Sequence, residues 1–170
     1  MSQSIYDASI PWFLHALGNL NSVLEKGGAH CEKEKIDPNA MLSARLYPDM
    51  FALTRQVQVV SDQAKGAAAR LAGVEAPKFA DTESSFAELS TRLDNTAKFL
   101  KGLDRSRFDG ADVRPIEVKF PQATLNFATG WTYLLGFVLP NIYFHSATAY
   151  DILRHNGVKL GKQDFIGAIK

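Results

Sequence analysis

Hydrophobic residues recur at alternating steps of four and three along the chain, and this spacing predicts amphipathic helices. The first helix is expected over residues 6–24, with a stop at the glycines 27–28 and with Pro11 either in its first turn or at a kink. The second is expected over residues 46–71, after a cap and first turn at 37–38. Its apolar stripe consists of Leu46, Met50, Leu53, Val57, Val60, Ala64, Ala67 and Leu71.

Two further helices follow the same pattern. Asp81 or Thr82 is expected to cap the third, whose apolar face spans residues 86–103. The fourth is expected to begin near Thr129 and to end at residues 156–157. Its stripe consists of Leu134, Val138, Ile142 or Asn141, His145, Ala149 and Ile152. Four long amphipathic segments predict an all-α, four-helix bundle.

The connections between these helices differ in character. Residues 27–37 are polar and predict a loop, in which Cys31 would be an exposed thiol. Residues 104–128 contain two short runs in which apolar and polar residues alternate, which is typical of strands. The apolar positions of these runs are Ile116, Val118, Phe120, Leu125 and Phe127. We therefore expect a small β-hairpin between the third and fourth helices, within one domain that spans residues 1–170.

Composition narrows the classes of function. The chain has 170 residues, 46% of them apolar and 22% charged, which is typical of a single globular domain. A formal charge of +1 gives no electrostatic reason to expect nucleic acid or a membrane as a partner. The N-terminus has no basic region and carries Asp7, so we expect a cytoplasmic protein without a secretory signal.

One uncharged stretch is long enough to suggest a membrane span. Residues 121–150 contain no Asp, Glu, Lys or Arg. Asn, Gln, Thr, Ser and His residues interrupt it, however, and its strongly apolar part, WTYLLGFVLP, is too short to cross a bilayer. We therefore expect a buried core helix here.

Two motifs carry a resemblance to a known family. The segments ARLYPDMFALTRQVQ and LPNIYFHSATAYDILRHNGVKLGKQDFIG resemble an uncharacterised bacterial family within the DinB/YfiT-like superfamily of four-helix bundles. The resemblance covers nearly the whole chain. It implies a DinB-like bundle, and because members of the superfamily are often dimeric, it also implies a homodimer.

The resemblance also bears on metal binding. Many superfamily members hold a divalent metal with three histidines, one on the second helix and two on the fourth, four residues apart. His145 could match one of the latter, but Asn141 and Ala149 occupy the positions four residues away, and the second helix has no histidine. We therefore expect that the three-histidine site is not retained. No cofactor is certain, and a divalent metal remains an alternative.

His145 is the first candidate for chemistry. It lies on the apolar stripe of the fourth helix, so its side chain is expected to point into the bundle. A buried neutral imidazole needs partners for its donor and its acceptor, and Asn141, one turn earlier, offers one. His145 is therefore either a satisfied core histidine or, near neutral pH, a metal ligand or general base.

Polar residues on the second helix form a ridge beside its apolar stripe. Asp49, Gln56 and Gln63 are spaced by seven residues. Asp49 and His145 are the first candidates for metal ligands, since a carboxylate could orient the imidazole or share a metal with it. The alternative is a solvated flank in which Asp49 pairs with Arg45, four residues before it. Tyr47 lies beside this pair.

Prolines add a reason to place a site here. Pro48 precedes Asp49, and Pro140 precedes Asn141, each within a helical pattern. Kinks at these points would open a polar pocket between the second and fourth helices. The alternative is that both prolines only bend their helices around the core.

Two functions therefore stay open. The first is a small-ligand-binding or scaffold protein, in which the polar pocket binds a small molecule. The second is a metal-dependent hydrolase or transferase with a remodelled site, in which His145 and Asp49 are ligands and Asn141 or Gln56 completes the set. Such oxygen-rich ligation would favour manganese or magnesium over zinc.

Overall fold

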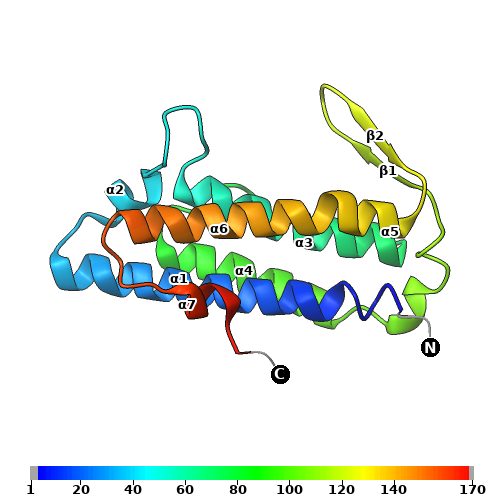
Figure 1. Cartoon of the computed structure of the whole chain (residues 1–170), viewed down its shortest axis with the longest axis horizontal. Helices are drawn as coiled ribbons and strands as arrows, with labels where there is room; N and C mark the ends of the chain where they lie inside the picture. The colour runs from blue at the N-terminus through cyan, green and yellow to red at the C-terminus, as the bar shows by residue number, and fades with distance from the viewer. Residues whose placement is uncertain (1–3, 169–170) are drawn as a thin grey trace.

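Four long helices lie side by side along one axis in the computed structural model, which describes residues 4–168 (Figure 1). Three of them are α1 (Ile10–Glu34), α3 (Leu53–Ala72) and α4 (Phe86–Lys101). The fourth is continuous from α5 (Gly130–Tyr133) through the π-helical segment η2 (Leu134–Val138) into α6 (Leu139–His155). The smaller elements are α2 (Pro38–Ser43), the 3-10 helix η1 (Arg105–Phe108), β1 (Ile116–Lys119), β2 (Thr124–Phe127) and α7 (Lys162–Ile166).

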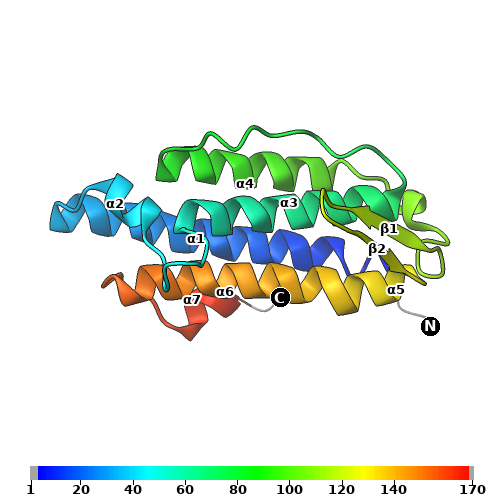
Figure 2. The same cartoon turned by 90° about the horizontal axis from the view of Figure 1, so that it is seen from above.

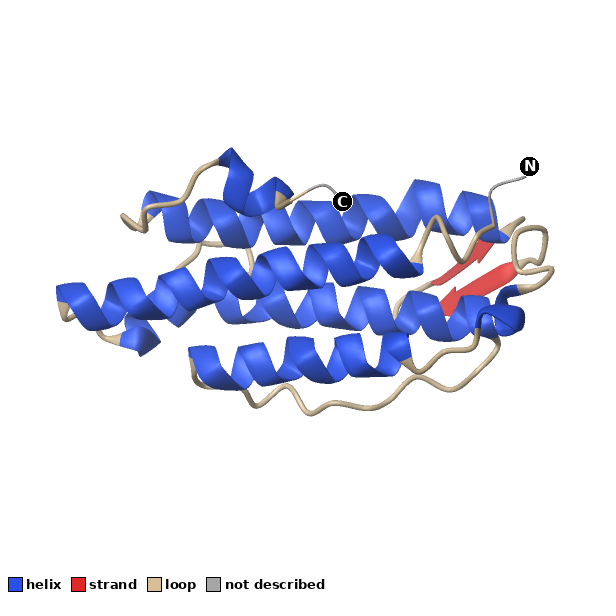
Figure 3. Cartoon of the chain, turned by 90° about the horizontal axis from the view of Figure 1, so that it is seen from below, coloured by secondary structure: helices blue, strands red, loops and turns tan. Residues whose placement is uncertain are grey.

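The order of the helices explains the long connections. α3 packs against α6 and α4, and α1 packs against the same two helices from the other side. α3 and α4 run in the same direction, so residues 73–85 return along the outside of α4 before α4 begins (Figures 2 and 3). The hairpin β1–β2 connects α4 to α5 at one end of the bundle (Figure 1).

The predicted core and hairpin are confirmed. Every apolar residue of the fourth stripe is buried, and so is the stripe of α3 from Leu53 onward. β1 pairs antiparallel with β2, with Ile116 opposite Phe127 and Lys119 opposite Thr124. Ile116 and Val118 point inward while their neighbours are exposed, as the alternation predicted. No helix among residues 4–168 is long and apolar enough to cross a membrane.

The first helix is longer than predicted. It does not stop at the glycines 27–28 but continues to Glu34, and Pro11 lies in its first turn. A Cβ on Gly27 would lie 2.9 Å from the side chain of Leu153 and 3.0 Å from that of Phe86, so this glycine permits close helix packing. The expected loop at 27–37 is therefore wrong. Cys31 is 1% exposed, and burial raises the pKa of its thiol.

The second helix begins later than predicted. Asp37 caps the separate short helix α2, where its carboxylate accepts from the backbone N–H of Asn39 at 2.9 Å. Residues 44–52 then form a loop, so Pro48 does not lie within a helix. The backbone N–H of Leu53 donates to the Ala44 carbonyl at 3.0 Å and closes the base of this loop.

The ends of the other two long helices test the predicted caps. Ser85, and not Asp81 or Thr82, caps α4, and its hydroxyl accepts from the backbone N–H of Glu88. Thr129 begins α5 with a capping box, as the sequence indicated. The expected distortion ahead of Pro140 takes the form of the π-helical turn η2.

A charge network ties the returning segment 73–85 to the bundle. Arg92 of α4 is 3% exposed, and its guanidinium bonds to Asp62 at 2.7 Å, Glu83 at 2.8 Å and Asp81 at 3.0 Å. Asp81 also accepts from Arg55 of α3 at 2.6 Å. One buried cation therefore joins α3, α4 and the segment between them.

Two glycines with opposite surroundings provide a test of this packing. A Cβ on Gly130 would collide with the carbonyl oxygen of Ala111, whereas a Cβ on Gly18, in the middle of α1, would meet nothing within 4 Å. We expect Gly130→Ala to lower the free energy of unfolding by about 2 kcal/mol, because backbone cannot yield as a side chain does. Gly18→Ala should raise it by about 0.5–1 kcal/mol. Denaturant unfolding measures both changes, and equal effects would contradict the packing described.

Candidate functional site

Gln56 of α3 and His145 of α6 meet where these two helices pack together. The amide oxygen Oε1 of Gln56 lies 2.6 Å from the imidazole Nδ1 of His145. The Gln56 side chain is almost wholly buried, and its Nε2 donates to the backbone carbonyl of Phe51 at 3.0 Å. A carbonyl only accepts, so this second bond fixes which end of the amide faces His145. The Nδ1–H of His145 therefore donates to Gln56.

The tautomer leaves one ring nitrogen of His145 available. When Nδ1 carries the proton of a neutral imidazole, Nε2 has a free lone pair. Within residues 4–168, Nε2 has no hydrogen-bond partner, and it is not among the fully buried atoms without one. His145 is half-buried, so Nε2 is open to solvent. The site therefore presents one hydrogen-bond acceptor of fixed orientation.

The protonation state of His145 follows from its surroundings. Burial is the main cause that lowers the pKa of His145 below the ordinary value of 6.5, and the nearby positive charge of Arg55 lowers it further. The imidazole is consequently neutral at neutral pH. The depressed pKa also favours folding above pH 6.5, and this contribution is lost as the pH falls through the pKa of the folded chain.

Aromatic rings flank the imidazole. The Phe51 ring stacks on His145 with centroids 6.4 Å apart and planes at 21°, and the Phe144 ring meets it edge-on at 5.1 Å. The guanidinium of Arg55 lies 5.9 Å from the centre of the Phe51 ring. Phe51 is 51% exposed and Phe144 is 58% exposed. Both rings therefore remain able to contact a ligand beside Nε2.

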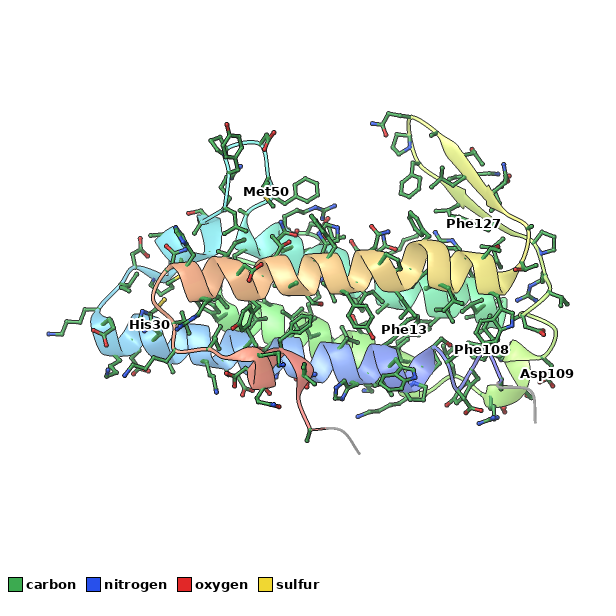
Figure 4. The ribbon with its side chains drawn as sticks, viewed as in Figure 1. Phe13, His30, Met50, Phe108, Asp109 and Phe127 are labelled. Carbon is green, nitrogen blue, oxygen red and sulfur yellow. The ribbon has the colours of Figure 1, made fainter. Side chains whose placement is uncertain are left out.

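The loop at residues 44–52 carries one of these rings. The loop projects from the same side of the bundle as the hairpin, with Met50 on the arm that returns to α3 (Figure 4). The guanidinium of Arg45 donates to the carbonyls of Pro48 at 3.4 Å and Met50 at 3.3 Å. Together with the bond from Gln56 to Phe51, these contacts hold the loop in place.

The other residues predicted for the site do not reach His145. Asp49 and Tyr47 are exposed in the loop, and Arg45 bonds to backbone carbonyls instead of pairing with Asp49. The Asn141 side chain donates to the Phe137 carbonyl of its own helix at 2.7 Å. Gln56, not Asn141, is therefore the partner of the imidazole.

Sequence reasoning missed three members of the site. Phe51 and Phe144 fall outside the apolar stripes, and Arg55 precedes Gln56 on α3. One feature of the sequence could have indicated Phe51. It lies in the segment FALTRQ, two positions before the helix begins, and its spacing does not match the buried stripe of that helix. Within residues 4–168, no group of three or more His, Cys, Asp or Glu side chains is placed to hold a metal ion.

Comparison with known proteins gives a family without an assigned activity. A family model described as "Domain of unknown function (DUF1993)" matches residues 5–166. The chain is also similar to a DinB family member from Shewanella denitrificans, known from a crystal structure. The identity is 39%, the match covers 97% of this chain and 93% of the other, and the TM-score is 0.88. No curated protein matches the chain. The predicted DinB-like four-helix bundle is confirmed.

The hydrogen bond between Gln56 and His145 predicts how the pKa of His145 responds to mutation. Gln56→Glu places a carboxylate against Nδ1–H, so we expect the pKa of His145 to move from below 6.5 to above it. The matched control is Gln63→Glu, the same change two turns further along α3, which should leave the pKa of His145 close to that of the unmodified chain. NMR titration of the ring nitrogens reports both the pKa and the tautomer. A proton on Nε2 in the unmodified chain would contradict the assignment.

Proposed function

The chain belongs to the DUF1993 family, a domain of unknown function, and from its own geometry we propose that it is a small-ligand-binding protein with its site at His145. The observation that carries the proposal is the fixed, solvent-open lone pair on Nε2. A surface histidine would rotate freely, whereas this imidazole is held by a buried amide. Because the His145 side chain is already ordered in the free protein, ligand binding causes little further loss of its conformational entropy.

The chemistry of the ligand follows from the groups around Nε2. A neutral imidazole nitrogen accepts a hydrogen bond, so the ligand must supply an N–H or O–H donor. The exposed rings of Phe51 and Phe144 favour a flat, apolar body that can pack against them. Arg55 is engaged by Asp81 and Gln58, which limits its use as a partner for an anion. The proposed ligand is a neutral, planar molecule with one donor.

The alternative metal centre does not fit the residues at this position. His145 offers one nitrogen, and Gln56 already uses its amide oxygen to hold the imidazole. Asp49 is exposed in the loop and Asn141 is bonded to its own helix, so neither completes a ligand set. Catalytic metal sites in proteins generally need three side-chain ligands. We therefore propose that the three-histidine centre of the superfamily is not retained here.

A matched pair of probes tests the ligand proposal. Indole carries an N–H donor on a flat ring, and N-methylindole has the same ring without the donor. We expect indole to bind about fivefold more tightly at neutral pH, as one net hydrogen bond predicts. The difference should disappear as the pH falls through the depressed pKa of His145, because protonated Nε2 no longer accepts. Calorimetry measures affinity, and ring resonances of His145 locate the binding.

A conservative variant provides the control. In His145→Asn the shorter amide can still donate to Gln56 in place of Nδ1–H, but nothing replaces Nε2. We expect this variant to bind both probes equally. Equal binding of the probes to the unmodified chain would contradict the proposal. A stoichiometric metal that co-purifies with untagged protein and is lost in His145→Ala would establish the metal-dependent alternative instead.

We further propose the homodimer that the resemblance implies, with the tip of loop 44–52 in the interface. Leu46 is 40% exposed and Tyr47 is 65% exposed, and both belong to the loop that also carries Phe51 of the proposed ligand site. We expect Tyr47→Asp to weaken dimerisation at least about tenfold, measured by analytical ultracentrifugation. Val113→Asp, at a position 67% exposed between η1 and β1, should have no such effect. A monomeric unmodified chain at micromolar concentration would contradict the dimer.

A further inference from the structure

A pocket lies on a different face of α6 from His145, between α6, α1 and the short helix α7. Its volume is about 220 Å³. The wall from α1 is formed by Trp12, Ala16, Leu20 and Val23, which share one face of the helix at steps of four and three. None of the residues that line the pocket is Asp, Glu, Lys or Arg. Its polar side chains include those of His15 and Asn19, and the rest of the wall is mainly apolar.

α7 closes one side of this pocket and is tied down by polar contacts. His15 Nε2 donates to the carbonyl of Ile166 at 2.6 Å, and Asn19 Nδ2 donates to the carbonyls of Ile166 and Phe165 at 2.8 and 3.1 Å. Lys26 of α1 also pairs with Asp164 at 2.5 Å. α7 lies against α1 along the outside of the bundle (Figure 1). The backbone carbonyls of Phe165 and Ile166 at the end of α7 thus accept hydrogen bonds from side chains of α1. These bonds hold α7 in place as one wall of the pocket.

Ser146 and Tyr143 are the residues of α6 with a hydroxyl in this lining, and that of Ser146 is buried and unpaired within residues 4–168. Ser146 is 5% exposed, and its Oγ has no hydrogen-bond partner within residues 4–168. Thr148, two residues further on, shows the usual solution on a helix, because its hydroxyl donates to the Phe144 carbonyl at 2.8 Å. A buried hydroxyl without a partner is unfavourable, and a ligand that pairs with it removes this cost.

We propose that this pocket binds a neutral molecule with one apolar ring and a single hydroxyl, and that phenols with a short alkyl chain are the ligand class. An engineered cavity of about 150 Å³ in another protein holds benzene, so about 220 Å³ accommodates a ring with a short substituent. The hydroxyl of the ligand pairs with Ser146 Oγ, while Trp12 and Tyr143 flank the ring. A charged ligand would lose its hydration without gaining a partner.

This site is independent of the one at His145. His145 faces Gln56 of α3, whereas Ser146 faces the pocket at α1. Consecutive residues on a helix point about 100° apart, so α6 can present the two side chains to different neighbours. The two proposals can therefore fail separately.

The test compares 4-ethylphenol with ethylbenzene by calorimetry on the whole chain. We expect the phenol to bind about fivefold more tightly to the unmodified chain, because it alone can pair with Ser146. In Ser146→Ala the preference should fall to about one, since the ring still fits but the hydroxyl has no partner. Ser22→Ala is the matched control, because Ser22 is exposed and bonds only to the Gly18 carbonyl of its own helix.

Two further variants locate the binding. The chain has two tryptophans, so Trp131→Phe leaves Trp12 as the sole reporter, and its fluorescence should change saturably with 4-ethylphenol. Ala16→Leu fills the space and should abolish that change while circular dichroism stays unchanged. If the preference for the phenol survives in Ser146→Ala, or if Trp12 does not respond, the proposal is overturned. Loss of binding in His145→Asn with retention in Ser146→Ala would also overturn it and assign the phenol to the other site.

Discussion

The packing of α3 against α6 is the constraint on which the rest of the structure depends. α3 presents small side chains to the core, among them Ala64 and Ala67, which are fully buried. The stripe of α6 and η2 presents larger ones, including Val138 and Ile142. Small residues on one helix let the two backbones approach closely. That proximity brings a short amide such as Gln56 within hydrogen-bond reach of an imidazole on the facing helix.

The sequence predicted the bundle well because its helices bury continuous stripes, and it failed where a local signal had a tertiary cause. Gly27 is typical of a helix end in the sequence, but in the structure its missing Cβ makes room for the side chains of Leu153 and Phe86. These two residues come from other helices, so the local sequence does not reveal the role of the glycine. The stripe of the second helix is predicted to begin at Leu46, because periodicity alone cannot show that residues 44–52 lie outside the helix. Pro48 carried that information, but a proline can also kink a helix without ending it.

The candidate site was predictable in part for the same reason. Gln56 and His145 both lie on helices whose phase is fixed by buried stripes, so their facing sides follow from residue spacing. Asp49 could not be placed in this way, because it lies in a loop, where helical spacing does not determine the direction of a side chain. Phe51 was equally inaccessible to such reasoning, since its contact with His145 depends on how the loop folds back over α3.

Charge is distributed so that both sites remain neutral. Arg92 is held by carboxylates at the far side of α3, and Arg55 shares one of them, so the ion pairs of this region lie in the network between α3 and α4. His145 could carry a charge, but burial and Arg55 keep it neutral at neutral pH. The pocket at Ser146 is lined by no Asp, Glu, Lys or Arg. Because the charges nearest His145 are paired between α3 and α4, the two proposed sites on α6 offer dipoles, and the proposed selection of neutral ligands rests on the position of a single hydrogen bond at each.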